Sequence, residues 1–326
     1  MKRIARQPRT TRLGFALLVV STTSAGCFRT PLGDAPVPAP DNGADRSDAS
    51  NLLGAVADGE PTAVAFVSVS VGYDFACGLR NDGTVACWGD NFNGDATPPE
   101  GTFVSVSAGA FFACGLRTDG TITCWGNTFD GETSPPAGTF ESVSASPSPL
   151  VCGVRTDGTV ACSGANDNGL TSPPAGTFAS ISPNSVFACG VRTDGSVACW
   201  GNPSDRETSP PAGTFASVSA GLAFACGVRT DGTVSCWGFN NSGQATPPAG
   251  TFVSVSAGDE FACGVRTNGT IACWGTPDPY PSAAKPPAGT FSSVSAGVYY
   301  ACGVRTSGAI ACWGDNSFGQ ATPPAP

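Results

Sequence analysis

No histidine occurs among the 326 residues, and sixteen basic residues stand against twenty-five acidic ones, for a formal net charge of −9. The first fact excludes histidine-based acid–base chemistry and Ser-His-Asp triads. The second leaves no basic stripe to displace the counterions of phosphates, so we expect no nucleic-acid partner. The 43 glycines and 28 prolines recur at fixed offsets, which is typical of turns in a repeat protein.

Residues 1–26 have the pattern of a signal peptide. Basic residues precede the apolar run Leu13–Val20, and small residues follow it. The alternative is a retained anchor helix, but the apolar run is far shorter than the roughly 20 residues that such a helix needs. We therefore expect an exported protein.

The segment after the signal peptide predicts a lipid-anchored tether. Ala25-Gly26-Cys27 resembles the bacterial lipobox, although Ser24 stands where leucine is usual, and the resemblance implies that Cys27 carries lipid. Phe28 replaces the aspartate associated with inner-membrane retention, which by analogy favours the outer membrane or cell surface. Residues 27–61 are rich in proline and aspartate and cannot bury enough apolar surface to fold, so we expect them to be flexible.

From residue 62 to residue 326 one unit recurs seven times: Gly-Thr-Phe-x-Ser-Val-Ser-Ala-Gly-x-x-Phe-Ala-Cys-Gly-Val-Arg-Thr-Asp-Gly-Thr-Val-Ala-Cys-Trp-Gly. The units repeat every 37 to 39 residues, a period typical of solenoids and propellers. In the second unit, Phe103–Ser107, Phe112–Leu116 and Thr121–Trp125 are rich in β-forming residues and are bounded by turn residues. Each unit therefore predicts a small sheet of three or four strands.

The second and third strands of each unit predict a hairpin, because turns such as Arg80–Thr84 carry glycine where positive φ is needed. The centre of the turn sets Cys77 opposite Cys87 and Leu79 opposite Val85, so both sulfurs leave the same face of the hairpin. Directly opposed cysteines at a non-hydrogen-bonded pair have the separation that a disulfide requires. The expected disulfides are Cys77–Cys87, Cys114–Cys124, Cys152–Cys162, Cys189–Cys199, Cys226–Cys236, Cys263–Cys273 and Cys302–Cys312.

The cysteine count supports this pairing. Fifteen cysteines make seven pairs plus Cys27, which lipidation would consume. The alternative is metal binding, but the nine-residue gap within each pair is not a zinc spacing, and histidine is absent. We therefore expect no metal and no cofactor. Disulfides require an oxidising compartment, in agreement with the signal peptide.

The two faces of each predicted hairpin differ in size. Phe75, Cys77 and Leu79 share one face, whereas Ala76 and Gly78 share the other, so large side chains of one unit can fill the space beside small ones of the next. An isolated unit is marginally stable, and closing a stack of units into a ring leaves few exposed edges. The prediction is an all-β, seven-bladed β-propeller over residues 62–326, with one disulfide per blade hairpin, as a monomer.

The strings Trp237-Gly-Phe-Asn-Asn-Ser-Gly-Gln244 and Trp313-Gly-Asp-Asn-Ser-Phe-Gly-Gln320, with Val-Ser-Ala-Gly upstream, resemble the regulator of chromosome condensation repeat. The resemblance implies a seven-bladed propeller, often closed by strands from both chain ends. The compact units are most similar to bacterial secreted members, including propeller-type β-lactamase inhibitor proteins. The position before Ala-Cys, often histidine in this family, is phenylalanine in most units and Tyr300 in the last. No inserted wedge is present, so a nucleotide-exchange function is not expected.

The units differ mainly on one face of the predicted ring. The turns between first and second strands and the loops after third strands emerge together there, and we call this the variable face. Exposed aromatic side chains beside acidic ones are typical of protein-binding hot spots. The candidate contact residues are Tyr73, Asp74, Phe111, Asp259, Glu260 and Tyr299. Further aromatic residues lie in the later loops, at Phe92, Phe129, Phe239, Tyr280 and Phe318. The alternative is that such rings pack between blades.

The opposite face carries one arginine per unit, which would suit an anion-binding ring. Its presence in every unit instead favours a structural role, through ion pairs and hydrogen bonds within each hairpin turn. The arginines are Arg80, Arg117, Arg155, Arg192, Arg229, Arg266 and Arg305. Units three and four deviate most, since Ser163 replaces tryptophan and Pro203–Arg206 replaces a glycine-containing loop. We interpret these deviations as drift.

Two functions remain. The first is an exported, lipid-anchored binding module that recognises a protein or a glycan through the variable face. The second is a polysaccharide hydrolase with paired carboxylates such as Asp74 and Asp259, which would have to lie ~5–9.5 Å apart in a cleft. We expect the binding module, and no catalytic residues.

Overall fold

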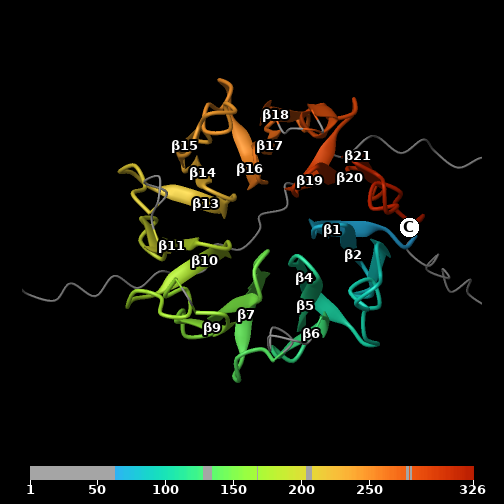
Figure 1. The fold of residues 1–326 in the computed structure, drawn as a ribbon, viewed down its shortest axis with the longest axis horizontal. Coiled ribbons are helices and arrows are strands. Elements are labelled where there is room, and N and C mark those ends of the chain that lie inside the picture. The colour runs from blue at the N-terminus through green and yellow to red at the C-terminus, as the bar shows by residue number, and fades with distance from the viewer. Residues whose placement is uncertain (1–62, 128–133, 167, 203–207, 277–278, 280) are drawn as a thin grey trace, which may run out of the picture. The chain divides into compact units, whose positions relative to one another are not determined.

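The computed structural model describes residues 63–127, 134–166, 168–202, 208–276, 279 and 281–326. These residues form seven antiparallel sheets of three strands each, arranged as blades around a ring (Figure 1). The seven-bladed propeller predicted from the repeats is therefore confirmed, and each blade has three strands. The predicted signal peptide, Cys27 and the tether lie outside the described residues, together with both predicted domain boundaries.

The strands recur at nearly equivalent positions in every unit, one residue or less from the ranges expected in the second unit. The first strands, nearest the ring axis, are β1 (Phe66–Val71), β4 (Phe103–Ala108), β7 (Phe140–Ala145), β10 (Phe178–Pro183), β13 (Phe215–Ala220), β16 (Phe252–Ala257) and β19 (Phe291–Ala296). The middle strands are β2 (Phe75–Arg80), β5 (Phe112–Arg117), β8 (Leu150–Arg155), β11 (Phe187–Arg192), β14 (Phe224–Arg229), β17 (Phe261–Arg266) and β20 (Tyr300–Arg305). The third strands are β3 (Val85–Gly89), β6 (Ile122–Gly126), β9 (Val160–Gly164), β12 (Val197–Gly201), β15 (Val234–Gly238), β18 (Ile271–Gly275) and β21 (Ile310–Gly314).

The one helical segment in the described part of the chain is the short 3-10 helix η1 (Pro281–Ala284), which lies in the loop after β18. Among the described residues, none belongs to a helix that is long and apolar enough to cross a membrane.

The hairpin register agrees with the prediction. Gly83 adopts a φ of 84°, which a side chain would disfavour, and Arg80 N–H bonds to Thr84 O at 2.8 Å to close the turn. Cys77 pairs with Cys87 and Leu79 with Val85, and the opposed cysteine Cα atoms are 4.0 Å apart. All seven hairpins carry the expected disulfide. The predicted pairing of fourteen cysteines is confirmed.

Neighbouring blades pack large side chains against small ones. Phe75, Cys77 and Leu79 of the first blade form one core cluster with residues of the second, among them Ala113 and Trp125. Main-chain bonds add to this packing, because the hairpin glycine of each blade accepts a hydrogen bond from the first phenylalanine of the next, as in Phe103 N–H to Gly83 O at 2.8 Å. The core of the propeller thus lies between the blades.

The last and first blades meet like any other pair. Phe66 N–H bonds to Gly308 O at 2.9 Å, and the indole Nε1 of Trp88 donates to Gln320 O at 2.9 Å. In the described part of the chain each sheet consists of three consecutive strands, so no blade combines strands from both chain ends. The closure by strands from both chain ends, which the resemblance gives as frequent in the family, is not used by the described residues. Side-chain packing with a few hydrogen bonds joins the two blades instead.

The third blade carries two compensating substitutions. Other blades pair an alanine of the middle strand with a tryptophan of the third, as Ala76 with Trp88. In the third blade the pair is Val151 with Ser163, and Val151 belongs to the core cluster shared with the second blade. The larger aliphatic residue therefore occupies part of the space that the absent indole leaves.

Candidate binding site on the variable face

The ring axis opens on the variable face into a cavity of about 230 Å³. The ends of the first strands and the turns that follow them supply its wall, with residues from all seven blades. Two of the candidate contact residues, Tyr73 and Asp259, belong to this wall. The cavity therefore places predicted residues of the first and sixth blades at one opening.

A ring of serines, which we did not single out from the sequence, lines the cavity. Its members are Ser70, Ser107, Ser144, Ser182, Ser219, Ser256 and Ser295. Six of the hydroxyls accept a hydrogen bond from a main-chain N–H of the next blade, as Ser70 Oγ does from Ala108 N at 2.9 Å. Ser144 is the exception, because Pro183 occupies the facing position and has no N–H. The sequence signal that could have revealed this serine ring is the Val-Ser-Ala string, which recurs in most units.

Tyr73 and Phe111 form a tilted aromatic pair at the edge of the cavity. Their ring centroids are 5.9 Å apart with an interplanar angle of 37°, and the main chains of the two turns meet through Tyr73 N–H and Ala110 O. The side chains are 38% and 44% exposed, which is unusual for large apolar rings that are already paired. The pair presents an aromatic surface toward solvent, as a binding role requires.

Asp259 is the carboxylate that borders the cavity. Burial, and then repulsion from Glu260, raises the pKa of Asp259 to about 6. Asp259 also acts on Tyr73. Burial raises the pKa of the Tyr73 phenol, and interactions with Tyr299, Asp74 and Asp259 raise that pKa further. Tyr299, Asp74 and Asp259 thus each lie within electrostatic range of Tyr73, and Glu260 acts on Asp259.

Asp74 belongs to a second group of acids, around the junction of the last and first blades. Burial raises the pKa of Asp74, and Asp90 and Asp315 add to the shift. Asp90 follows β3, and its N–H bonds to Asp74 O at 2.9 Å. The charges that raise the pKa of Asp74 therefore differ from the charge that raises the pKa of Asp259. Among the described residues, Asp74 and Asp259 do not form an interacting pair of carboxylates.

Asp95 was also missed from the sequence, although it stands where the fifth and seventh units have glutamine, Gln244 and Gln320. In the last blade, Gln320 Nε2 donates to Asp315 Oδ2 at 3.0 Å. The equivalent residues of the first blade are Asp95 and Asp90, so a carboxyl replaces the amide. Asp95 is 1% exposed, and burial followed by the charges of Asp90 and Asp74 raises its pKa to about 6.

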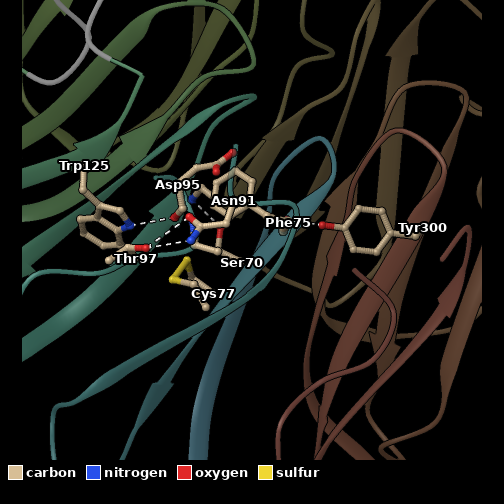
Figure 2. Close-up of a disulfide and its surroundings, with 11 residues drawn as sticks. Ser70, Phe75, Cys77, Asn91, Asp95, Thr97, Trp125 and Tyr300 are labelled. Atoms are coloured by element: carbon tan, nitrogen blue, oxygen red, sulfur yellow. Dashed lines mark hydrogen bonds between the residues drawn. A yellow bond between two sulfur atoms is a disulfide. The ribbon is translucent and has the colours of Figure 1, made fainter. Parts of the chain in front are cut away.

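The loop that carries Asp95 is held by hydrogen bonds on both sides. Trp125 Nε1 of the second blade donates to Asp95 O at 2.9 Å, and Asn91 bonds to Thr97 at 2.9 Å (Figure 2). The tip of the loop, Phe92, is 91% exposed. The loop is thus fixed at its base and presents an aromatic side chain to solvent.

The remaining candidates lie on the same face with varied exposure. Glu260 and Tyr299 are half-buried. Phe318 is 54% exposed, and Phe239 is half-buried. Phe129 and Tyr280 lie outside the described residues. The packing alternative therefore suits Phe239 better than Phe92 or Phe318.

The arginines of the opposite face are structural, but for a reason other than the one we expected. In each blade the guanidinium carbon lies 4.8–5.1 Å from the ring centroid of the phenylalanine that begins the first strand. In six blades Nη1 also donates to a main-chain carbonyl, as Arg229 does to Ala212 O at 3.0 Å. The turn aspartates instead accept hydrogen bonds from hydroxyls, as Asp231 does from Thr233 Oγ1 at 2.7 Å, and these lower the pKa of Asp231. The guanidinium groups are thus already engaged, which argues against an anion-binding ring.

No group of three or more Cys, Asp or Glu side chains suited to a metal ion occurs in the part of the chain that the structure describes.

The model of the regulator of chromosome condensation (RCC1) repeat matches residues 66–95, 103–132, 215–244, 252–278 and 291–320. The units left unmatched are the third and fourth, which deviate most in sequence. No curated protein sequence matches the chain significantly.

Similar solved structures come from several sources. The ectodomain of the receptor kinase CR4 from Physcomitrella patens is 29% identical, with a TM-score of 0.67 over 77% of this chain and 74% of that one. The CRINKLY WD40 ectodomain of the receptor kinase ACR4 from Arabidopsis thaliana is 27% identical, with a TM-score of 0.66 over 80% of this chain and 98% of that one. Human WBSCR16 is 14% identical, with a TM-score of 0.61 over 72% of this chain and 84% of that one, and shows the fold alone.

Proposed function

This chain carries RCC1 repeats folded into a disulfide-linked propeller, and we propose that it is an exported binding module that recognises a partner protein through the variable face. The observation that carries the proposal is the exposed pair Tyr73 and Phe111 at the edge of a cavity lined by Asp259. Large aromatic side chains contribute much of the binding energy in protein interfaces. They lie where the blades differ, whereas the opposite face repeats the same contacts in each blade.

Export is supported by two independent features. Seven disulfides are stable in an oxidising compartment and rare in the cytosol. Two similar structures above 25% identity are ectodomains of receptor kinases. Together with the signal peptide pattern and the lipobox at Cys27, these features support a lipid-anchored protein at the outer membrane or cell surface, joined to its anchor by residues 27–61.

The hydrolase alternative gains no support from the described residues. Asp74 is influenced by Asp90 and Asp315, and Asp259 by Glu260, so the two acids belong to separate groups. A glycosidase needs its carboxyl groups on either side of one bond. We therefore propose a module without enzymatic activity and without a cofactor.

A pull-down tests the binding face. Immobilised residues 62–326 would capture partners from a cell-envelope extract, and Tyr73→Ala/Phe111→Ala should reduce recovery of a specific partner at least tenfold. The matched control is Val104→Ala/Val253→Ala, which removes two exposed apolar side chains near the hairpin ends of the first strands. Recovery that is unchanged in the aromatic variant, or equally reduced in both, would refute the proposed face. Release of sugar from polysaccharides by the wild type would favour the hydrolase.

A further inference from the structure

Asp259 has no positive partner in the described part of the chain. Its carboxylate forms no hydrogen bond there, and Glu260, the charged group that acts on it, is also negative. The described arginines lie at the hairpins of the opposite face, each against a phenylalanine ring. A partly buried carboxylate without a counterion loses hydration without compensation. A ligand that brings a positive charge would restore that balance.

The wall next to Asp259 is also suited to a cation. Tyr73 lines the same cavity, and its ring is tilted against the ring of Phe111, with the two centroids 5.9 Å apart. The face of an aromatic ring attracts an ammonium or guanidinium group within about 6 Å. Each serine hydroxyl of the ring has two acceptor lone pairs, of which the main-chain N–H of the next blade uses one in six blades. Acceptors for further N–H groups therefore surround the cavity.

The size of the cavity limits the occupant. Pockets for drug-sized ligands measure roughly 300–1,000 Å³. A cavity of about 230 Å³ is below that range and is open on the variable face, so it suits one side chain projecting from a larger partner. The described acids Asp74, Asp90, Asp259, Glu260 and Asp315 all lie on this face, which attracts a positively charged partner surface over a longer range.

We propose that the cavity on the variable face receives a single lysine or arginine side chain of a partner protein. Asp259 is its counterion, and the ring of Tyr73 contacts its charged group. This inference rests on the proposed function, because the partner approaches the variable face. The inference adds to that function the kind of side chain that the partner inserts. The arginine or lysine anchors the partner at the ring axis, and the surrounding aromatic residues exclude water from the contact.

The probe for this pocket is a set of capped amino acids. The sequence has four tyrosines, so a protein labelled with ¹³C-tyrosine gives a simple NMR spectrum in which Tyr73→Phe assigns the Tyr73 signal. At pH 7.5, Nα-acetyl-arginine methylamide or its lysine counterpart should shift that signal in a saturable manner. The neutral isostere Nα-acetyl-citrulline methylamide should not.

Charge variants complete the test. Asp259→Asn should weaken binding of the arginine probe at least tenfold, and Asp259→Glu should retain part of the affinity. The control Glu100→Gln removes one exposed negative charge elsewhere and should leave the affinity unchanged. Equal binding of citrulline, or equal arginine binding by Asp259→Asn, would overturn the inference. A Tyr73 shift on addition of methyl glucoside that survives in Asp259→Asn would assign the cavity to a glycan instead.

The two proposals fail separately. A partner that the wild type and Asp259→Asn recover equally, but Tyr73→Ala/Phe111→Ala does not, would preserve the binding face and reject the cation pocket. If no partner is captured, the amino-acid probes still decide whether the pocket takes a cation.

Discussion

The hydroxyl of Tyr300 donates a hydrogen bond to the main-chain carbonyl of Phe75, across the junction between the last and first blades (Figure 2). Tyr300 is fully buried, and burial raises the pKa of its phenol well above the ordinary value. The other blades carry phenylalanine or leucine at this position. The bond is therefore specific to the junction where the ring closes.

Tyr300→Phe tests the contribution of that bond. The ring shape is preserved, and Phe75 O keeps the N–H of Gly72 at 2.8 Å, so we expect a loss of about 0.5–1.5 kcal/mol in the free energy of unfolding. Urea unfolding with intact disulfides measures the change. Tyr73→Phe, at an exposed ring, is the control and should unfold like the wild type. An unchanged midpoint for Tyr300→Phe would mean that the bond adds no stability.

Asp95→Gln tests the pH dependence of the first blade. The ordinary pKa of Asp is 3.8 and that of folded Asp95 is about 6, so between these values the folded state binds a proton that the unfolded state does not. The Asp95 contribution to stability therefore falls as pH rises through this window and stays low above it. The variant carries the amide of the last blade and should be more stable than the wild type at pH 7.5, by on the order of 1–3 kcal/mol.

The advantage of Asp95→Gln should largely disappear at pH 3.5, where Asp95 is mostly protonated in both states. Urea midpoints at several pH values measure it, and the contribution from Asp259, which does not act on Asp95, cancels in the comparison. Parallel pH profiles for the two proteins would show that Asp95 does not titrate abnormally.

Val151 and Ser163 should be coupled in stability. Ser163→Trp alone inserts an indole beside the larger Val151 and should destabilise the fold by about 1–3 kcal/mol through overpacking. The double variant Val151→Ala/Ser163→Trp reproduces the pair found in six other blades and should recover most of that loss. A double-mutant cycle measures the coupling energy. Additive effects of the two substitutions would contradict the compensation that we describe.

One disulfide is enough to measure the stabilisation by the hairpin crosslinks. Cys226→Ala/Cys236→Ala should lower the free energy of unfolding by about 2–3 kcal/mol, because the unfolded chain loses a short covalent loop. The hairpin itself should persist, since the turn at Gly232 and the packing against the neighbouring blades remain. Intact mass before and after reduction counts the crosslinks: seven disulfides in the wild type and six in the variant.

The elements that the sequence predicted well are those set by local chemistry. A hairpin with glycine at the positive-φ position of its turn has a definite centre, so the pairing of Cys77 with Cys87 followed by counting. The seven-fold repeat then determined the number of blades, because no blade buries its large face alone. Strand alternation also placed the turns after the first strands together at one end of the ring.

Contacts between blades were not predictable from the same strings. The serine of Val-Ser-Ala is identical in every unit, and which main-chain N–H it meets depends on the angle between neighbouring blades. The raised pKa of Asp95 depends on its burial and on its distance from Asp90, and the loop conformation sets both. Arg229 looked like the partner of Asp231 along the chain, but stacking on Phe215 turns its guanidinium toward Ala212 O.

The gap at Ser144 has a consequence for how the ring opens. The junction between the chain ends has its serine bond, its tryptophan bond and the bond from Tyr300. The third blade has Ser163 in place of the tryptophan that would face the second blade, although Ala145 N–H still bonds to Ser107 Oγ there. At its junction with the fourth blade, Pro183 removes the serine bond, although Trp200 Nε1 still donates to Leu170 O. The two junctions of the third blade thus lack one bond each, so amide hydrogen exchange of the intact protein should be fastest in β7 to β10. A mechanical load should part the ring at one of these two junctions before it separates the blades where the chain begins and ends.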